Sequence, residues 1–301
     1  MTALPARGAA GRRRPASAWL WGAVGLVALA AAWELYKLAG PADGLVLGET
    51  RVLPRTSDLA MPHVWDMVIR FFAGETRAPT ADPLWFVVAQ AALVTLGIAA
   101  AGLVAGVVLG LALAVAMLSL RPVRWGLLPW IVLSQTVPLI AFAPLVRSWG
   151  SQIQIGAFEW QDWMSVALIA SYLAFFPVAV GALAGLDAPD RIHLELMRTY
   201  GVGWWRTLLA LRLPASVPYL LTALRLAAAN AIVGAVVAEV STGMQGGIGR
   251  MIIQFAGQAS GDPAKAWAPI FGAIALGLIG AGSVALLGWL LRDYRRVEVS
   301  S

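Results

Sequence analysis

Residues 84–120 read LWFVVAQAALVTLGIAAAGLVAGVVLGLALAVAMLSL, an apolar stretch of 37 positions without one charged side chain. A helix needs about 20 apolar residues to cross a hydrocarbon core roughly 30 Å thick. At 1.5 Å per residue this stretch would measure about 55 Å as one helix, which is too long for a single crossing. We therefore expect a leading segment over 84–91 and a membrane span over 92–119.

Five further apolar blocks have the length of a membrane span. They cover residues 18–39, 125–146, 163–186, 216–240 and 266–291. The composition agrees, because 59% of the residues are hydrophobic and 13% are charged, whereas soluble domains carry about 25% charged residues. The sequence predicts an all-α integral membrane protein with six transmembrane helices. Cysteine is absent, which excludes disulfides and cysteine–zinc sites.

The positions of lysine and arginine predict the orientation. If the N-terminus lies inside the cell, the inner connections are roughly twice as rich in Lys and Arg as the outer ones, as in cytoplasmic loops generally. Both termini are then cytoplasmic, in a multi-pass protein of the bacterial inner membrane. The net charge of +6 follows from this topology, so no nucleic acid is expected as a partner. Arg12-Arg13-Arg14 before an apolar run also fits a secretory signal, but five later spans favour an uncleaved first span.

The chain divides into five expected regions. They are a basic cytoplasmic tail (1–17), the first transmembrane helix (18–39), an external loop (40–83), a core of five spans (84–291) with a cytoplasmic loop at 187–215, and a cytoplasmic tail (292–301). Two stripes of small residues recur every four positions in the core, a spacing that lets helices approach closely in lipid, either within one chain or across a dimer. They are Gly102, Gly106 and Gly110 in one span and Ala273, Gly277 and Ala281 in another.

The cytoplasmic loop at 187–215 is longer than the 2–8 residues that usually join helices in a bundle. Asp190 can cap a short helix, Gly201 can end it, and Pro214 can close a second helix before the fifth span. Two short helices joined at a glycine would form a compact knob that fits a groove on a soluble partner. The alternative is an amphipathic helix lying on the lipid surface, with Trp204 and Trp205 as interfacial anchors.

The same loop carries a resemblance to a known family. It reads Glu195-Leu-Met-Arg-Thr-Tyr-Gly201 and ends in Leu213-Pro214, which resembles the EAA loop of ATP-binding-cassette importer permeases. Leu196 and Met197 stand where that motif usually has two small residues. The proline-containing segment 134–144 and the glycines of 246–249 resemble the nitrate/sulfonate/taurine branch of these permeases. The similarity covers residues 85–291.

This resemblance implies a type I importer permease fold and a set of partners. The partners are cytoplasmic ATPase subunits, an external substrate-binding protein and a second permease chain, identical or different, within membrane lipid. It also implies that the loop couples the chain to the ATPase. The coupling residues would be Glu195, Gly201, Trp205, Leu213 and Pro214. The solute would be nitrate, an aliphatic sulfonate or taurine, although permeases for thiamine-pyrimidine precursors and riboflavin look similar.

The ATPase must be a separate chain. A phosphate-binding loop needs Gly-Lys-Ser/Thr, and the two lysines, Lys37 and Lys265, follow Tyr36 and Ala264. ATP would therefore bind the partner, and no cofactor or metal is expected here. The two histidines, His63 and His193, lie far apart in the sequence.

Polar residues within the spans are the candidates for a substrate path, because burying them in lipid is costly. The polar side chains are Gln135, Thr136, Arg225, Asn230 and Glu239. Pro138 joins them because we expect it to kink its span and to free a backbone carbonyl, which is tolerated where it lines a cavity. Each has a structural alternative: interhelical hydrogen bonding for Gln135, anchoring for Arg225, and a gate or a partner of Arg250 for Glu239. Arg225 and Glu239 are about 21 Å apart along one helix and cannot pair there.

Two other function classes are alternatives to the importer. An ion-coupled secondary transporter usually shows more spans, inverted internal symmetry and membrane carboxylates, and the sequence shows no such symmetry and no two acids together in the membrane. An intramembrane enzyme needs a catalytic set within the spans, but there is no Gly-x-Ser-x-Gly elbow and no pair of neighbouring acids. We therefore expect no enzyme activity from this chain.

Overall fold

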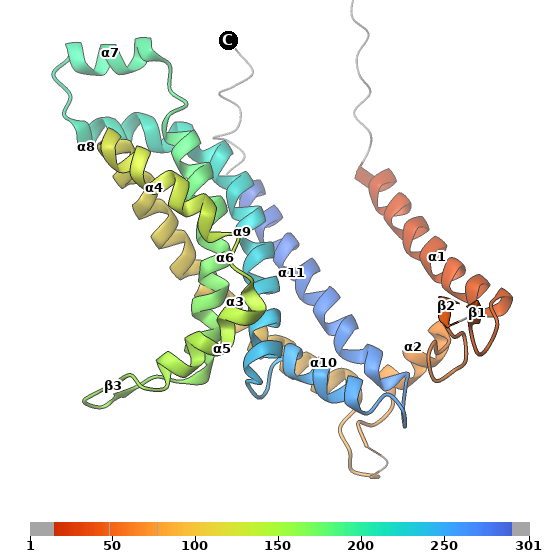
Figure 1. Ribbon diagram of the computed structural model, residues 1–301. Coiled ribbons are helices and arrows are strands. Elements are labelled where there is room, and N and C mark those ends of the chain that lie inside the picture. Colours follow the sequence, from red (N-terminus) through yellow and green to blue (C-terminus); the bar gives the residue numbers. More distant parts are fainter. Residues whose placement is uncertain (1–14, 48, 77, 291–301) are drawn as a thin grey trace, which may run out of the picture.

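The computed structural model describes residues 15–290 except 48 and 77 (Figure 1). The helices are α1 (Pro15–Ala39), α2 (Val64–Phe72), α3 (Leu84–Ser119), α4 (Arg121–Ser134), α5 (Leu139–Gly150), α6 (Asp162–Leu186), α7 (Arg191–Thr199), α8 (Trp204–Thr207), α9 (Leu213–Thr242), α10 (Ile248–Gly257) and α11 (Ala268–Leu290). A π-helical turn, Leu208–Arg212, joins α8 to α9, and a 3-10 turn, Lys265–Trp267, precedes α11. Two small hairpins complete the described chain, β1 (Leu45–Leu47) with β2 (Thr50–Leu53) and β3 (Gln154–Ile155) with β4 (Phe158–Glu159).

Five helices of the described chain are long and apolar enough to cross a membrane, and the pair α4–α5 makes a sixth if it counts as one span. The five are Leu20–Ala39, Leu84–Ser119, Asp162–Leu186, Trp204–Thr242 and Lys265–Leu290. The axes of α4 and α5 differ by 103° across the break at 135–138. Pro138 is the N-cap residue of α5, so the expected proline kink is present and is a sharp one.

Two sequence expectations about helix limits are wrong. The segments 84–91 and 92–119 form one uninterrupted helix, α3, since no proline or charge breaks the apolar run. Pro214 does not end a separate helix, because Trp204–Thr242 is one helical stretch. The π-turn before it changes the hydrogen-bond register, and Pro214 lies directly after this change, in the first turn of α9.

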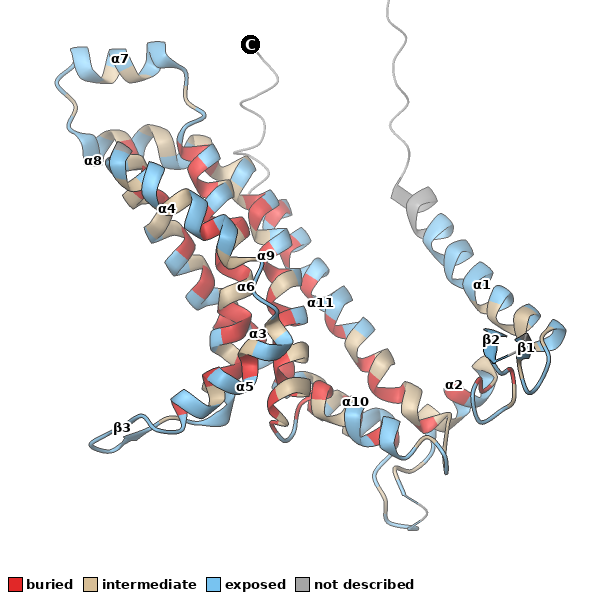
Figure 2. Ribbon diagram, in the orientation of Figure 1, coloured by how far each residue is buried: buried red, intermediate tan, exposed pale blue. Residues whose placement is uncertain are grey.

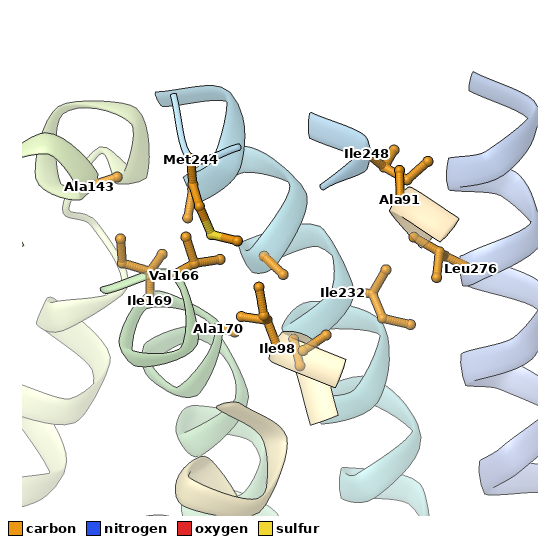
Figure 3. Close-up of a cluster of buried hydrophobic side chains, with 14 of the residues drawn as sticks. Ala91, Ile98, Ala143, Val166, Ile169, Ala170, Ile232, Met244, Ile248 and Leu276 are labelled. Atoms are coloured by element: carbon orange, nitrogen blue, oxygen red, sulfur yellow. The ribbon is translucent and has the colours of Figure 1, made fainter. Parts of the chain in front are cut away.

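The centre of the bundle is formed by α3, α6 and α9, and α5, α10 and α11 pack against these helices (Figure 3). The predicted stripe on α3 packs closely against α6. A Cβ added at Gly102 would lie 2.5 Å from Ala170 Cβ, and one added at Gly106 would lie 2.8 Å from Ala174 Cβ. Because these glycines carry no side chains, the backbone of α3 contacts α6 directly.

The stripe on α11 is not the buried face of that helix within this single chain, and packing across a dimer stays a prediction. The buried face of that helix includes Gly272, Gly280 and Gly288, whereas Gly277 has open space beside it. In an apolar helix that is hydrophobic on every side, composition does not identify the packed face.

The first helix, α1, stands apart from the bundle along most of its length (Figures 1 and 2). Its last turns are fastened to the connection before α2. Lys37 Nζ donates to Asp58 Oδ1 and to the Met61 carbonyl, each at 2.6 Å. Glu34 accepts from the Val64 N–H at 2.7 Å. The predicted tails 1–17 and 292–301 fall outside the described residues, apart from the start of α1 at Pro15.

Candidate functional site

The loop that joins α6 to α9 carries α7 away from the bundle, at the end of the molecule opposite α2 and α10 (Figure 1). No residue of α7 is buried (Figure 2). Helices in a single chain normally bury one face, so this helix presents a surface without a covering element in the described chain.

Gly201 makes the turn between α7 and α8. It has φ +67°, the left-handed conformation that glycine adopts without a steric penalty. The Gly201 and Val202 N–H groups donate to the carbonyls of Arg198 and Met197, each at 2.9 Å, as at a glycine-terminated helix. The predicted helix stop is confirmed. Asp190 is the N-cap residue of α7, but its side chain makes no capping hydrogen bond.

The exposed surface of this loop combines apolar side chains with charged ones. Ile192, Tyr200 and Trp205 are 77%, 77% and 67% exposed. Glu195, which lies on α7 together with Ile192, is also exposed. Trp204 packs edge-on against Trp205, with ring centroids 4.6 Å apart. An apolar patch with a charged residue suits a protein partner better than bulk water.

Charged side chains close the base of the loop. Arg212 donates to the Leu186 carbonyl at 2.6 Å and lies 3.6 Å from Asp187. Arg124, at the start of α4, forms an ion pair with Asp187 at 2.6 Å. These three residues were not among the predicted site residues. The signal that could have found them is the placement of opposite charges at the two ends of the loop, Asp187 and Arg212.

The predicted coupling residues occupy two places. Glu195, Gly201 and Trp205 lie on the loop itself. Leu213 and Pro214 lie behind it, in the first turn of α9. The loop and the long helix are therefore joined without a flexible linker.

The candidates for a substrate path are spread over the bundle. Gln135 and Thr136 follow α4 at the break; the Gln135 amide donates to Ser134 Oγ at 3.2 Å and the Thr136 hydroxyl donates to the Leu133 carbonyl. Asn230 donates to the Leu173 carbonyl of α6 at 3.3 Å. These hydrogen bonds are with residues of the chain itself.

Arg225 faces two grooves. One, of about 930 Å³, lies between α6 and α9, and the other, of about 390 Å³, lies between α9 and α11. Apart from the arginine, both are lined mainly by apolar side chains. Arg225 is exposed in this single chain.

Glu239 is completely buried and does not face a groove. Its Oε2 accepts from the Gly249 N–H of α10 at 2.7 Å and from the Thr95 hydroxyl of α3 at 3.1 Å. Within the described residues it forms no ion pair with Arg250. The structure therefore does not support a pore-facing Glu239: the carboxylate ties three helices together. Thr95 was missed, although it is one of three polar residues in the apolar run 84–120.

Comparison with known proteins identifies the family. Residues 106–296 match the family described as "Binding-protein-dependent transport system inner membrane component". The chain is 34% identical over 208 residues to the formylaminopyrimidine transport permease protein ThiX of Halalkalibacterium halodurans, covering 68% of this chain and 77% of that protein.

More distant relatives include two permeases for sulfur compounds. A putative aliphatic sulfonates transport permease protein, SsuC of Bacillus subtilis, is 31% identical over 52% of each chain. The taurine transport system permease protein TauC of Escherichia coli is 33% identical over 41% of this chain and 42% of its own. The crystal structure of an amino acid ABC transporter with histidines superposes with a TM-score of 0.53 at 16% identity, covering 71% of this chain and 95% of that one. The chain is therefore an inner-membrane permease subunit of the binding-protein-dependent ATP-binding-cassette importer family.

Proposed function

We propose that this permease forms the membrane path for a small solute and receives mechanical work from a separate ATPase at the loop 187–215. The observation that carries the proposal is the uncovered helix α7, which stands outside the bundle at the end opposite α10. An ATPase cleft that receives α7 would cover Ile192, Tyr200 and Trp205. Both termini would lie on the same, cytoplasmic side.

The loop is built to transmit a displacement. Its base is fixed by Arg212 and Arg124 around Asp187. From Trp204 the chain continues without interruption to Thr242. A push on α7 and α8 would therefore tilt a rigid rod that carries Arg225 and reaches α10 at its far end.

The solute path would follow the surface of this rod. The grooves beside Arg225 are open in one chain, so a second permease chain, identical or different, would close them. Residues 135–138 at the sharp break are a second part of the path, because backbone that leaves a helix within a membrane is tolerated where it lines a cavity. Asn230 would support the wall through α6.

The names of the relatives give different solutes: a formylaminopyrimidine, aliphatic sulfonates and taurine. All are small and polar. We propose a solute of this kind, of the nitrate, sulfonate or taurine type, with a thiamine-pyrimidine precursor or riboflavin as the alternative. An external binding protein would deliver it.

The test is reconstitution of the chain in liposomes with its ATPase and binding protein. Glu195→Arg is expected to abolish co-purification of the ATPase and ATP-driven uptake. Glu159→Arg introduces the same charge change at an exposed position of β4, at the opposite end of the molecule, and should leave ATPase binding intact. Retention of the ATPase by Glu195→Arg, or equal loss in both variants, would contradict the proposal.

A further inference from the structure

A recess of about 240 Å³ lies at the end of the molecule opposite α7, where α3, α10 and the turn before α10 meet. On the proposed topology this is the external end. Its polar side chains come from four places in the sequence. They are Glu75, Gln90, Gln245, Arg250 and Gln254. The volume is several times the roughly 30 Å³ that one water occupies, which is enough for a small organic molecule.

Arg250 lacks a partner for part of its guanidinium group. Its Nε is buried and has no hydrogen-bond partner in the described chain. No described carboxylate forms an ion pair with it. A buried N–H without an acceptor costs free energy, and the cost is larger for a charged group. Because Nε is enclosed by the protein, an acceptor from outside the chain would bind the terminal guanidinium nitrogens of Arg250, for which the described chain likewise provides no hydrogen-bond partner.

The N-terminus of α10 is not that donor, because it is already occupied. The Ile248 N–H donates to Thr95 Oγ1 at 2.9 Å, and the Gly249 N–H donates to Glu239 Oε2 at 2.7 Å. Attraction of an anion in the recess therefore rests on the Arg250 side chain, with the Gln90 and Gln254 amides as further donors.

Glu75 decides the kind of ligand. Its carboxylate lines the same recess as Arg250, yet the two form no ion pair in the described structure. A simple anion would be attracted by Arg250 and repelled by Glu75. A small molecule that carries both charges would be attracted at each end.

We propose that this recess is an external binding site for a small zwitterion with an oxyanion at one end and an ammonium group at the other. The planar guanidinium of Arg250 binds the oxyanion through paired N–H donors, and Glu75 binds the ammonium group. The inference rests on the proposed function, since such a site would hold the solute before it enters the membrane path.

The test is calorimetric titration of the full-length chain in lipid nanodiscs, without ATPase or binding protein. Three probes separate the charges: taurine carries both, ethanesulfonate only the anion, and ethylammonium only the cation. Taurine is expected to bind at least ten-fold more tightly than either of the others. Arg250→Gln should weaken taurine binding at least ten-fold. Glu75→Gln should reduce taurine to the affinity of ethanesulfonate without weakening ethanesulfonate.

The matched control is Arg55→Gln, which removes the same charge from an exposed arginine in the connection before α2 and should leave all three affinities unchanged. If Arg250→Gln does not fold, Arg250→Lys and Gln254→Leu replace it, each with several-fold weaker taurine binding expected. Absence of taurine binding in the unmodified chain, unchanged affinity in the recess variants, or an equal loss in Arg55→Gln would overturn the inference. If ATP-driven uptake is observed but taurine does not bind in the recess, the binding site is contradicted and the proposed function stands. If taurine binds in the recess but no ATP-driven uptake is observed, the proposed function is contradicted and the binding site stands.

Discussion

Gly201 and Gly203 lie two residues apart at the turn after α7 and differ in backbone conformation. Gly201 has φ +67° and Gly203 has φ −65°, and a Cβ at either position would meet nothing within 4 Å. Alanine at Gly201 must enter the left-handed region, which costs about 1–2 kcal/mol, whereas alanine at Gly203 fits. Gly201→Ala should weaken ATPase binding roughly five- to thirty-fold, measured by titrating the ATPase onto the reconstituted permease.

Two variants control for this turn. Gly203→Ala should bind the ATPase like the unmodified chain, and Gly201→Asn should recover part of the loss, because asparagine tolerates positive φ better than alanine. Equal weakening by Gly201→Ala and Gly203→Ala would show that the loop needs flexibility at both positions rather than the left-handed turn at Gly201.

Glu239 holds α3 and α10 against α9 through one carboxylate oxygen. Glu239→Ala leaves the Gly249 N–H without an acceptor, and an unsatisfied buried group costs about 1–3 kcal/mol. It also removes the hydrogen bond from Thr95, whose hydroxyl keeps the Ala91 carbonyl as an acceptor. Glu239→Gln keeps an oxygen for Gly249. We expect a clearly lower melting temperature for the alanine variant and a value near the original for the glutamine variant. Ser241→Ala, which loses only a bond to Val237 of its own helix, should melt unchanged; an unchanged Glu239→Ala would refute this role.

At the scale of elements, the contact of α3 with α6 depends on glycine at particular positions. A Cβ at Gly106 would lie 2.8 Å from Ala174 Cβ and 2.9 Å from the Ser171 carbonyl oxygen, whereas a Cβ at Gly97, on the same helix, meets nothing within 4 Å. Gly106→Ala should destabilise the chain by about 1–3 kcal/mol through overpacking. Gly97→Ala should be neutral or stabilising by up to about 1 kcal/mol. The melting temperatures of the two variants in detergent test this prediction. Equal changes in both would show that the contact of α3 with α6 does not depend on Gly106.

The attachment of α1 to the connection before α2 should depend on pH. The hydrogen bond and charge of Lys37 lower the pKa of the Asp58 carboxyl below its ordinary value. Its contribution to stability is therefore fully present above about pH 3.9 and is lost as the pH falls through the lower folded-state pKa. The difference in melting temperature between the unmodified chain and Asp58→Asn should be present near neutral pH and vanish in acid. A difference that does not change with pH would exclude this ion pair as its source.

At the scale of the whole molecule, composition and periodicity predicted more of the fold than of the site. The membrane helices and the kink at Pro138 follow from apolar length and a single residue type. The place of Glu239 could not be predicted, because its partner Thr95 is 144 residues away and only packing brings the two together. Around the loop, Glu195 and Gly201 could be found from local spacing, but the closure by Arg124 and Arg212 needed the fold.

The orientation of the chain in the membrane decides whether α7 can contact a cytoplasmic ATPase. Because the sequence has no cysteine, single introduced cysteines can report this orientation by thiol labelling. His193→Cys places a thiol on α7, and Ser151→Cys places one after α5 at the other end of the molecule; both positions are exposed. In intact cells a membrane-impermeant maleimide should label Ser151→Cys and leave His193→Cys unmodified, and permeabilisation should expose both. Inside-out vesicles should reverse the pattern. Labelling of His193→Cys in intact cells would put α7 outside, where no ATP is available to drive it, and the coupling role of the loop would have to be abandoned.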